Sequence, residues 1–156
     1  MANFLRIILL LSAAISSYAC AEELATLKWS KVNATYFEFS LPDNFKKVAR
    51  HGDDSYVGEY QSKTVLLSFD YGLYSNSLQK LDSYSEYLER TEIIHGHKAK
   101  IVTYTKPSAK FVIAINFPKG GRLYKSGNAL TIISICRSKR DYEVVQKIYA
   151  SIRFLE

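Results

Sequence analysis

The stretches Lys110-Phe-Val-Ile-Ala-Ile-Asn-Phe117 and Ala129-Leu-Thr-Ile-Ile-Ser-Ile-Cys136 decide the fold of this chain. In the first stretch every second residue from Phe111 onwards is large and apolar, which is the pattern of a β-strand with one buried face. The second stretch is the most apolar segment after residue 30 and is typical of a strand at the centre of a sheet. The chain is therefore expected to fold around a β-sheet.

Further strands are predicted upstream of these two stretches. At residues 36–41, Phe37 and Phe39 share one face of an alternating segment, while Glu38 lies on the other. A tight turn at Gly96 is expected to join two more strands. The additional predicted strands cover residues 36–41, 56–61, 65–71, 92–94 and 97–105.

Two helices are predicted from capping boxes. Ser83 and Glu86 have the spacing of a capping box and predict a short helix that ends at Arg90. Ser138 and Asp141 form a second such pair, which precedes a clear amphipathic pattern. The apolar residues of this closing helix are Tyr142, Val145, Tyr149 and Ile152, and residues 151–154 are expected to return as a short strand.

These elements predict an α+β fold, with an antiparallel β-sheet of about six strands flanked by helices. The helices are too few for a regular alternation of strands and helices. The chain has 156 residues, of which 47% are apolar, so a disordered chain is not expected. Residues 22–156 are long enough to bury one core and are interpreted as a single domain.

Residues 1–21 have the pattern of a secretory signal peptide. Arg6 precedes a short apolar run at residues 7–15, and small residues follow up to Ala21. The run is shorter than the roughly 20 residues that a membrane-spanning helix needs. Two interpretations of its end stay open: cleavage after Ala21, or a lipobox that makes Cys20 a lipid-bearing first residue. The protein is therefore expected to be exported, to the periplasm or the medium, or lipid-anchored in the bacterial envelope.

The charge of the chain is unevenly distributed. Residues 22–97 contain 8 Lys and Arg against 12 Asp and Glu, whereas residues 98–156 contain 12 against 3. A basic surface for an anionic partner such as a phospholipid surface, and scattered solvated lysines, are the two interpretations. Nucleic acid is not an expected partner, because the basic residues are not combined with a stacking motif. The basic residues near Gly120-Gly121 predict a contact loop made of Lys119, Arg122 and Lys125.

Three segments resemble PsbP-like domains. The segment Phe-Glu-Phe-Ser-Leu-Pro-Asp-Asn-Phe at residues 37–45 is similar to their opening strand and turn, residues 87–101 to their mid-chain helix and following strand, and residues 148–154 to their closing helix. Within this superfamily the predicted signal peptide favours the DcrB-like proteins of the bacterial envelope. The resemblance implies an α/β/α sandwich and a binding or scaffolding role without a shared chemistry.

The residues that could carry chemistry are few. His95 and His97 flank Gly96 and could ligate a metal ion, although no further ligand lies close in sequence. Cys136 is interpreted as a buried apolar residue, with a disulfide to Cys20 as the alternative. No cofactor motif is present. The leading hypothesis is a non-catalytic envelope protein that binds a protein or envelope component, and the alternative is a small secreted hydrolase or metal-dependent enzyme that uses His95 and His97.

Overall fold

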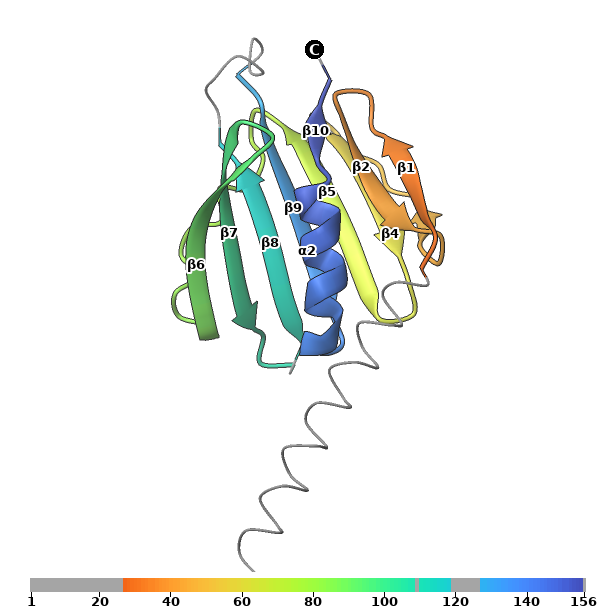
Figure 1. Cartoon of the computed structure of the whole chain (residues 1–156). Helices are drawn as coiled ribbons and strands as arrows, with labels where there is room; N and C mark the ends of the chain where they lie inside the picture. The colour runs from red at the N-terminus through yellow and green to blue at the C-terminus, as the bar shows by residue number, and fades with distance from the viewer. Residues whose placement is uncertain (1–26, 109, 119–126, 156) are drawn as a thin grey trace, which may run out of the picture.

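The structure is a computed structural model that describes residues 27–108, 110–118 and 127–155, and Figure 1 shows the arrangement of its elements. The contact loop predicted from Lys119, Arg122 and Lys125, the predicted signal peptide and Cys20 lie outside the described residues. The elements are β1 (Trp29–Asn33), β2 (Phe37–Pro42), β3 (Lys46–Val48), β4 (Tyr56–Gln61), β5 (Val65–Gly72), β6 (Ser85–Ile94), β7 (His97–Thr105), β8 (Phe111–Phe117), β9 (Ala129–Cys136), the 3₁₀ turn η1 (Lys139–Asp141), α2 (Tyr142–Ala150) and β10 (Arg153–Phe154).

Seven strands form one antiparallel sheet in the order β3-β4-β5-β9-β8-β7-β6. The strand β9 lies at the centre, where Ile132 is opposite Phe69 of β5 on one side and Ile115 of β8 on the other. The strands predicted at residues 110–117 and 129–136 are confirmed, as is the central position of the second. Their apolar side chains are buried because each strand has a neighbour on both sides and because both faces of the sheet are covered by other segments.

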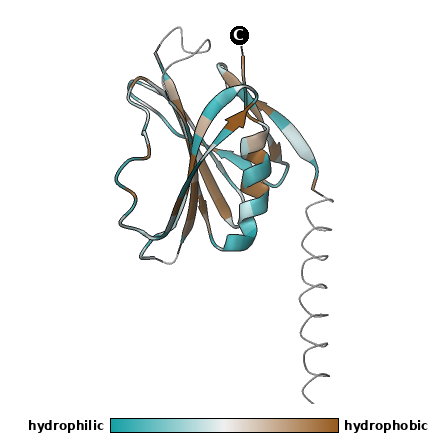
Figure 2. Cartoon of the chain, turned by 60° about the vertical axis from the view of Figure 1, so that its left-hand side comes forward, coloured by the Kyte–Doolittle hydropathy of each residue, from teal (hydrophilic) through white to brown (hydrophobic). Residues whose placement is uncertain are grey.

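A small sheet and a helix cover one face of the large sheet. The small sheet has the order β1-β2-β10, and α2 lies beside it across β8 and β9 (Figure 1). Phe37 and Phe39 of β2 pack with Phe69 of β5, at ring-centroid distances of 5.2 Å and 6.3 Å. From the helix, Val145, Ile148 and Tyr149 are buried. The hydrophobic sides of the helix and of the central strands face one another in Figure 2.

The closing helix confirms the sequence prediction. The backbone N–H of Ser138 donates to Asp141 Oδ2 at 3.2 Å, as a capping box requires. Tyr149 anchors the helix, because its hydroxyl donates to the Ile113 carbonyl at 2.8 Å and lies 3.0 Å from Ser134 Oγ. The predicted return strand is β10, which pairs with β2.

The far face of the large sheet is covered by the segment between β5 and β6. Leu78 is buried there with Val102 and Val112, and Tyr84 stacks on Tyr104 at a centroid distance of 4.7 Å. This segment has no regular secondary structure, so an irregular connection takes the place that a second helix would have in a three-layer sandwich.

The predicted α+β sandwich is wrong. Of the described residues, 53% lie in strands and 10% are helical, with α2 as the one α-helix among them, and the strands form two antiparallel sheets. The helix predicted from Ser83 and Glu86 to Arg90 is part of the edge strand β6, which pairs with β7. The α/β/α arrangement implied by the PsbP-like resemblance is contradicted for the same reason.

The physical reason for this error lies in the position of β6 at an edge. An edge strand exposed on both faces needs no apolar alternation, so the periodicity of a strand is missing from its sequence. A capping-box spacing then gave the stronger local signal. In the structure a β-bulge lies between Ser85 and Leu88, and Glu86 has a φ of 54°, which no helix accommodates. No helix in the described part of the chain is both long and apolar enough to cross a membrane.

Candidate functional site: a basic cleft at the end of α2

A cleft of about 560 Å³ lies where the C-terminal end of α2 meets β2, β10 and the turn between β6 and β7. We call it the α2 cleft. It is lined by Lys31, Glu38, Phe39, Ser40, His95, Lys147, Ala150, Ser151 and Arg153.

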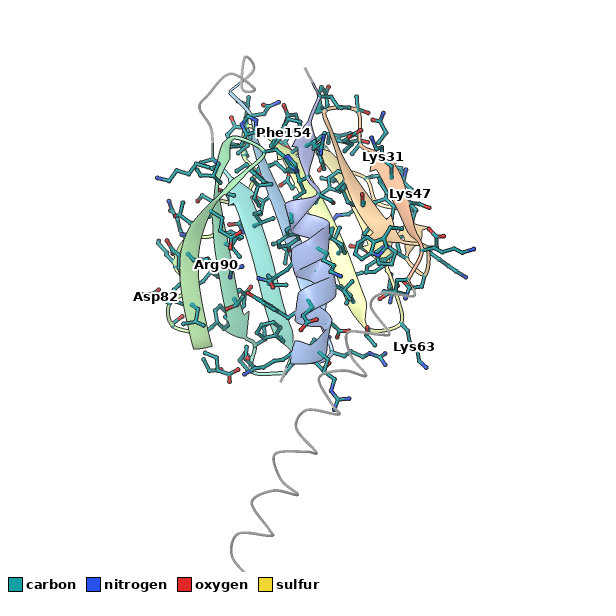
Figure 3. All side chains as sticks on the ribbon, in the orientation of Figure 1. Lys31, Lys47, Lys63, Asp82, Arg90 and Phe154 are labelled. Atoms are coloured by element: carbon teal, nitrogen blue, oxygen red, sulfur yellow. The ribbon has the colours of Figure 1, made fainter. Side chains whose placement is uncertain are left out.

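The alternation of β2 determines which side chains reach the α2 cleft. Phe37 and Phe39 are buried against the large sheet, so Glu38 and Ser40 point to the outside of the small sheet. Strand pairing adds a basic residue to each of them, because Lys31 of β1 lies opposite Ser40 and Arg153 of β10 lies opposite Glu38. Directly opposed residues share a face. Figure 3 shows Lys31 on the small sheet.

The end of α2 closes the other side of the cleft. Ser151 follows the helix, and its hydroxyl accepts a hydrogen bond from the Ser40 backbone N–H at 2.8 Å and donates to the Ile148 carbonyl at 2.6 Å. These two bonds join the last turn of the helix to Ser40, a part of β2 that does not pair with β10. Lys147 is exposed one turn earlier.

The α2 cleft has an excess of positive charge. Lys31 forms an ion pair with Glu38 at 2.9 Å, whereas none of the ion pairs among the described residues includes Lys147 or Arg153. Three cations against one carboxylate leave a formal excess of two positive charges, and His95 is not counted in this balance. The C-terminal end of a helix contributes about half a negative charge, which is too small to reverse this sign.

His95 joins the hairpin of β6 and β7 to the end of α2. Its Nε2 lies 3.1 Å from the Ala150 carbonyl oxygen, which can only accept, so Nε2 carries the proton in this contact. His95 and Gly96 have φ values of 46° and 84°, which are typical of a tight two-residue hairpin turn. His95 therefore lies at the α2 cleft.

The second histidine has different surroundings. The ring of His97 packs edge-on against Phe154 at a centroid distance of 5.2 Å. Burial and, to a smaller extent, the nearby His95 lower the pKa of His97. Among the described residues there is no group of three or more His, Cys, Asp and Glu side chains that could hold a metal ion. The described residues therefore provide no group in which further ligands join His95 and His97 around a metal ion.

Cys136 is buried at the end of β9, with 1% of its surface exposed, as predicted for an apolar cysteine. Burial raises the pKa of its thiol to about 12, so the thiolate is disfavoured at neutral pH. Its proposed disulfide partner, Cys20, lies outside the described residues.

The α2 cleft was not predicted from the sequence. Lys31, Lys147 and Arg153 belong to three separate elements, and each of them looks like an ordinary solvated residue in its own segment. The alternation at residues 36–41 was the one available signal, since it placed Glu38 and Ser40 on the outer face.

The comparisons with known proteins do not name a family for this chain. No protein-family model matches it. The search of curated proteins likewise finds no match.

Proposed function

We propose that this chain is an exported, non-catalytic binding module of the bacterial envelope, which holds an anionic group of an envelope component in the α2 cleft. The observation that carries this proposal is the convergence of Lys31, Lys147 and Arg153 on one cleft that contains a single carboxylate. The pattern of residues 1–21 supports export.

The chemistry of the α2 cleft favours a phosphate or carboxylate group as the ligand. A guanidinium such as that of Arg153 can donate two parallel hydrogen bonds to either group, and an ammonium such as that of Lys147 adds a flexible point charge. The volume of about 560 Å³ is larger than one such group needs. The anion is therefore proposed to be part of a larger molecule.

Binding is favoured over catalysis because the reactive side chains at the cleft, Ser151 and His95, are engaged in structural hydrogen bonds. The hydroxyl of Ser151 both accepts from Ser40 and donates to Ile148, and His95 Nε2 donates to Ala150. Each group thus supports the wall of the cleft. Covalent catalysis needs a nucleophile and a base within hydrogen-bond distance of one another, and Ser151 and His95 form no such pair, since each bonds to other groups.

The test is a titration with two small anions, pyrophosphate and citrate, at low ionic strength. The Lys147→Glu/Arg153→Glu double variant should bind at least about tenfold more weakly, because a hydrogen bond to a charged group contributes about 1.5–3 kcal/mol. The Lys46→Glu/Lys47→Glu variant is the matched control, since it makes the same change of charge on β3. Calorimetry that finds equal affinities for the two variants, or no binding by the unmodified chain, would contradict the proposal.

A further inference from the structure

A second basic region lies at the opposite end of the large sheet. Three connections meet there: residues 62–64 between β4 and β5, the described residues 106–108 and 110 between β7 and β8, and residues 137–141 between β9 and α2. The registers place them together, because Cys136 at the end of β9 lies opposite Val65 of β5 and Phe111 of β8. We call their cations the basic rim, which consists of Lys63, Lys106, Lys110, Arg137, Lys139 and Arg140.

The basic rim keeps most of its positive charge. Asp141 is the one acidic residue of the three connections, and it accepts from Ser138 and from Thr64 Oγ1, at 2.7 Å for the latter. Glu86 of β6 pairs with Lys139 at 2.6 Å. Six cations against these two carboxylates leave a formal excess of four positive charges, and counting Glu143 of the first turn of α2 leaves three.

A hollow of about 210 Å³ opens in the basic rim, between the turn of β4 and β5 and the adjacent ends of β8 and β9. Lys63, Lys110 and Arg137 line it from three different connections, together with the hydroxyl-bearing Ser62 and Thr64. In Figure 3, Lys63 extends outward from this end of the sheet. The hollow thus offers three cations to one small anion such as a phosphate group.

The described chain begins at the same end. Lys46 of β3 lies opposite Gln61, next to the turn that carries Lys63, and the preceding Asp43 donates its backbone N–H to the Lys28 carbonyl at 3.0 Å. The strand β1 therefore begins at the end of the molecule where β4 ends (Figure 1).

We propose that the basic rim binds the surface of a bilayer that contains anionic phospholipids, with a lipid phosphate in the hollow between Lys63, Lys110 and Arg137. The helix α2 runs from the basic rim to the α2 cleft, and its 9 residues span about 13 Å. The α2 cleft then faces away from the membrane. This inference stands on the basic rim and does not depend on the proposed function of the α2 cleft.

The experiment is vesicle co-sedimentation of the full chain carrying Cys20→Ser, which cannot bear a lipid at that position. Vesicles of phosphatidylcholine alone are compared with vesicles that contain phosphatidylglycerol. Binding should require phosphatidylglycerol and weaken as salt is raised. The Lys63→Glu/Lys110→Glu variant should bind at least about 25-fold more weakly, because each basic residue near an anionic surface contributes about fivefold. Both positions are exposed, and circular dichroism verifies that the variant is folded.

The control for this experiment is the Lys80→Glu/Lys98→Glu variant, which makes the same change of charge at two exposed lysines outside both the basic rim and the α2 cleft and should bind vesicles like the parent chain. Equal loss in both variants would show a general effect of net charge and would overturn the proposal. So would sedimentation that does not depend on phosphatidylglycerol, or an absence of sedimentation. Capture of an acidic polypeptide such as polyglutamate without capture of vesicles would also overturn it and assign the basic rim to a protein partner.

Discussion

The basic rim and the α2 cleft are both basic, but they are built in different ways. The basic rim contains Arg137, Lys139 and Arg140 from a single connection, so its charge follows closely from the basic second half of the sequence. The α2 cleft combines Lys31 of the first described strand with Arg153 of the last. A local run of charge predicts the first kind of surface, whereas only strand pairing creates the second.

The two regions also rest on different structural elements. The basic rim lies on connections of the large sheet, whereas the α2 cleft needs the helix, the small sheet and the β6–β7 turn to be in place. A change that loosens α2 should therefore affect the α2 cleft more than the basic rim.

The largest expected effect comes from removing the anchor of α2. Tyr149 is 1% exposed, and its hydroxyl bonds to Ile113 and Ser134. Replacing a large buried aromatic residue by alanine costs about 3–5 kcal/mol. Tyr149→Ala should therefore lower the free energy of unfolding by this amount in urea denaturation.

The milder variant Tyr149→Phe separates packing from hydrogen bonding. It keeps the ring and leaves Ser134 Oγ without this partner, at an expected cost of about 1–3 kcal/mol. A Tyr149→Ala chain with the stability of the parent would contradict the anchoring role of this residue.

An intermediate effect is expected at the basic-rim end of α2. Asp141→Asn replaces by a neutral amide the carboxylate that accepts hydrogen bonds from the Ser138 backbone N–H and the Thr64 hydroxyl. Stability should fall by about 1 kcal/mol, because a hydrogen bond to a charged group contributes more than one between neutral groups. The same change adds one positive charge to the excess of the basic rim. Binding to phosphatidylglycerol vesicles should therefore rise by about fivefold, and the affinity of the α2 cleft for citrate should stay the same.

The outcome of Asp141→Asn distinguishes the two regions sharply, because stability and vesicle binding are expected to change in opposite directions. Vesicle binding that falls together with stability would show that the basic rim depends on the hydrogen bonds of Asp141 to Ser138 and Thr64.

The smallest effect is the pH dependence caused by His97. Its pKa is lowered from 6.5 by burial and then by His95, so the unfolded chain binds this proton more readily than the folded chain. Stability from this group is complete above pH 6.5 and is lost as the pH falls from 6.5 towards the lowered pKa. His97→Gln should make the urea midpoint less dependent on pH between 7.5 and 5.5.

Vesicle binding should not follow this titration. Histidine is the side chain whose ordinary pKa lies in this range, and the basic rim contains none. Hydrogen bonds from Lys139 and Thr105 lower the pKa of Glu86, so this carboxylate stays charged. A marked change of vesicle binding between pH 7.5 and 5.5 would place a titrating group in the membrane contact.

Particular elements show how far the sequence predicts this fold. The strands β8 and β9 and the helix α2 were predicted correctly, because their burial imposes a strong periodicity on the sequence. The edge strand β6 was predicted to begin as a helix, because an element exposed on both faces carries no such periodicity. The predicted tight turn at Gly96 between two strands is confirmed, with His95 as the other turn residue, but the contact of His95 with Ala150 had no signal in sequence.

The sequence by itself determined that the chain folds around a central apolar strand, ends in an amphipathic helix and carries its positive charge in its second half. Only the tertiary structure decided that the strands divide into two sheets, that β6 pairs with β7, and that Lys31, Lys147 and Arg153 face one cleft. The physical reason is that burial acts on each segment separately and leaves a local pattern. The pairing of strands and the convergence of side chains on a cleft instead depend on contacts between segments far apart in the chain. Such contacts leave no pattern within any single segment.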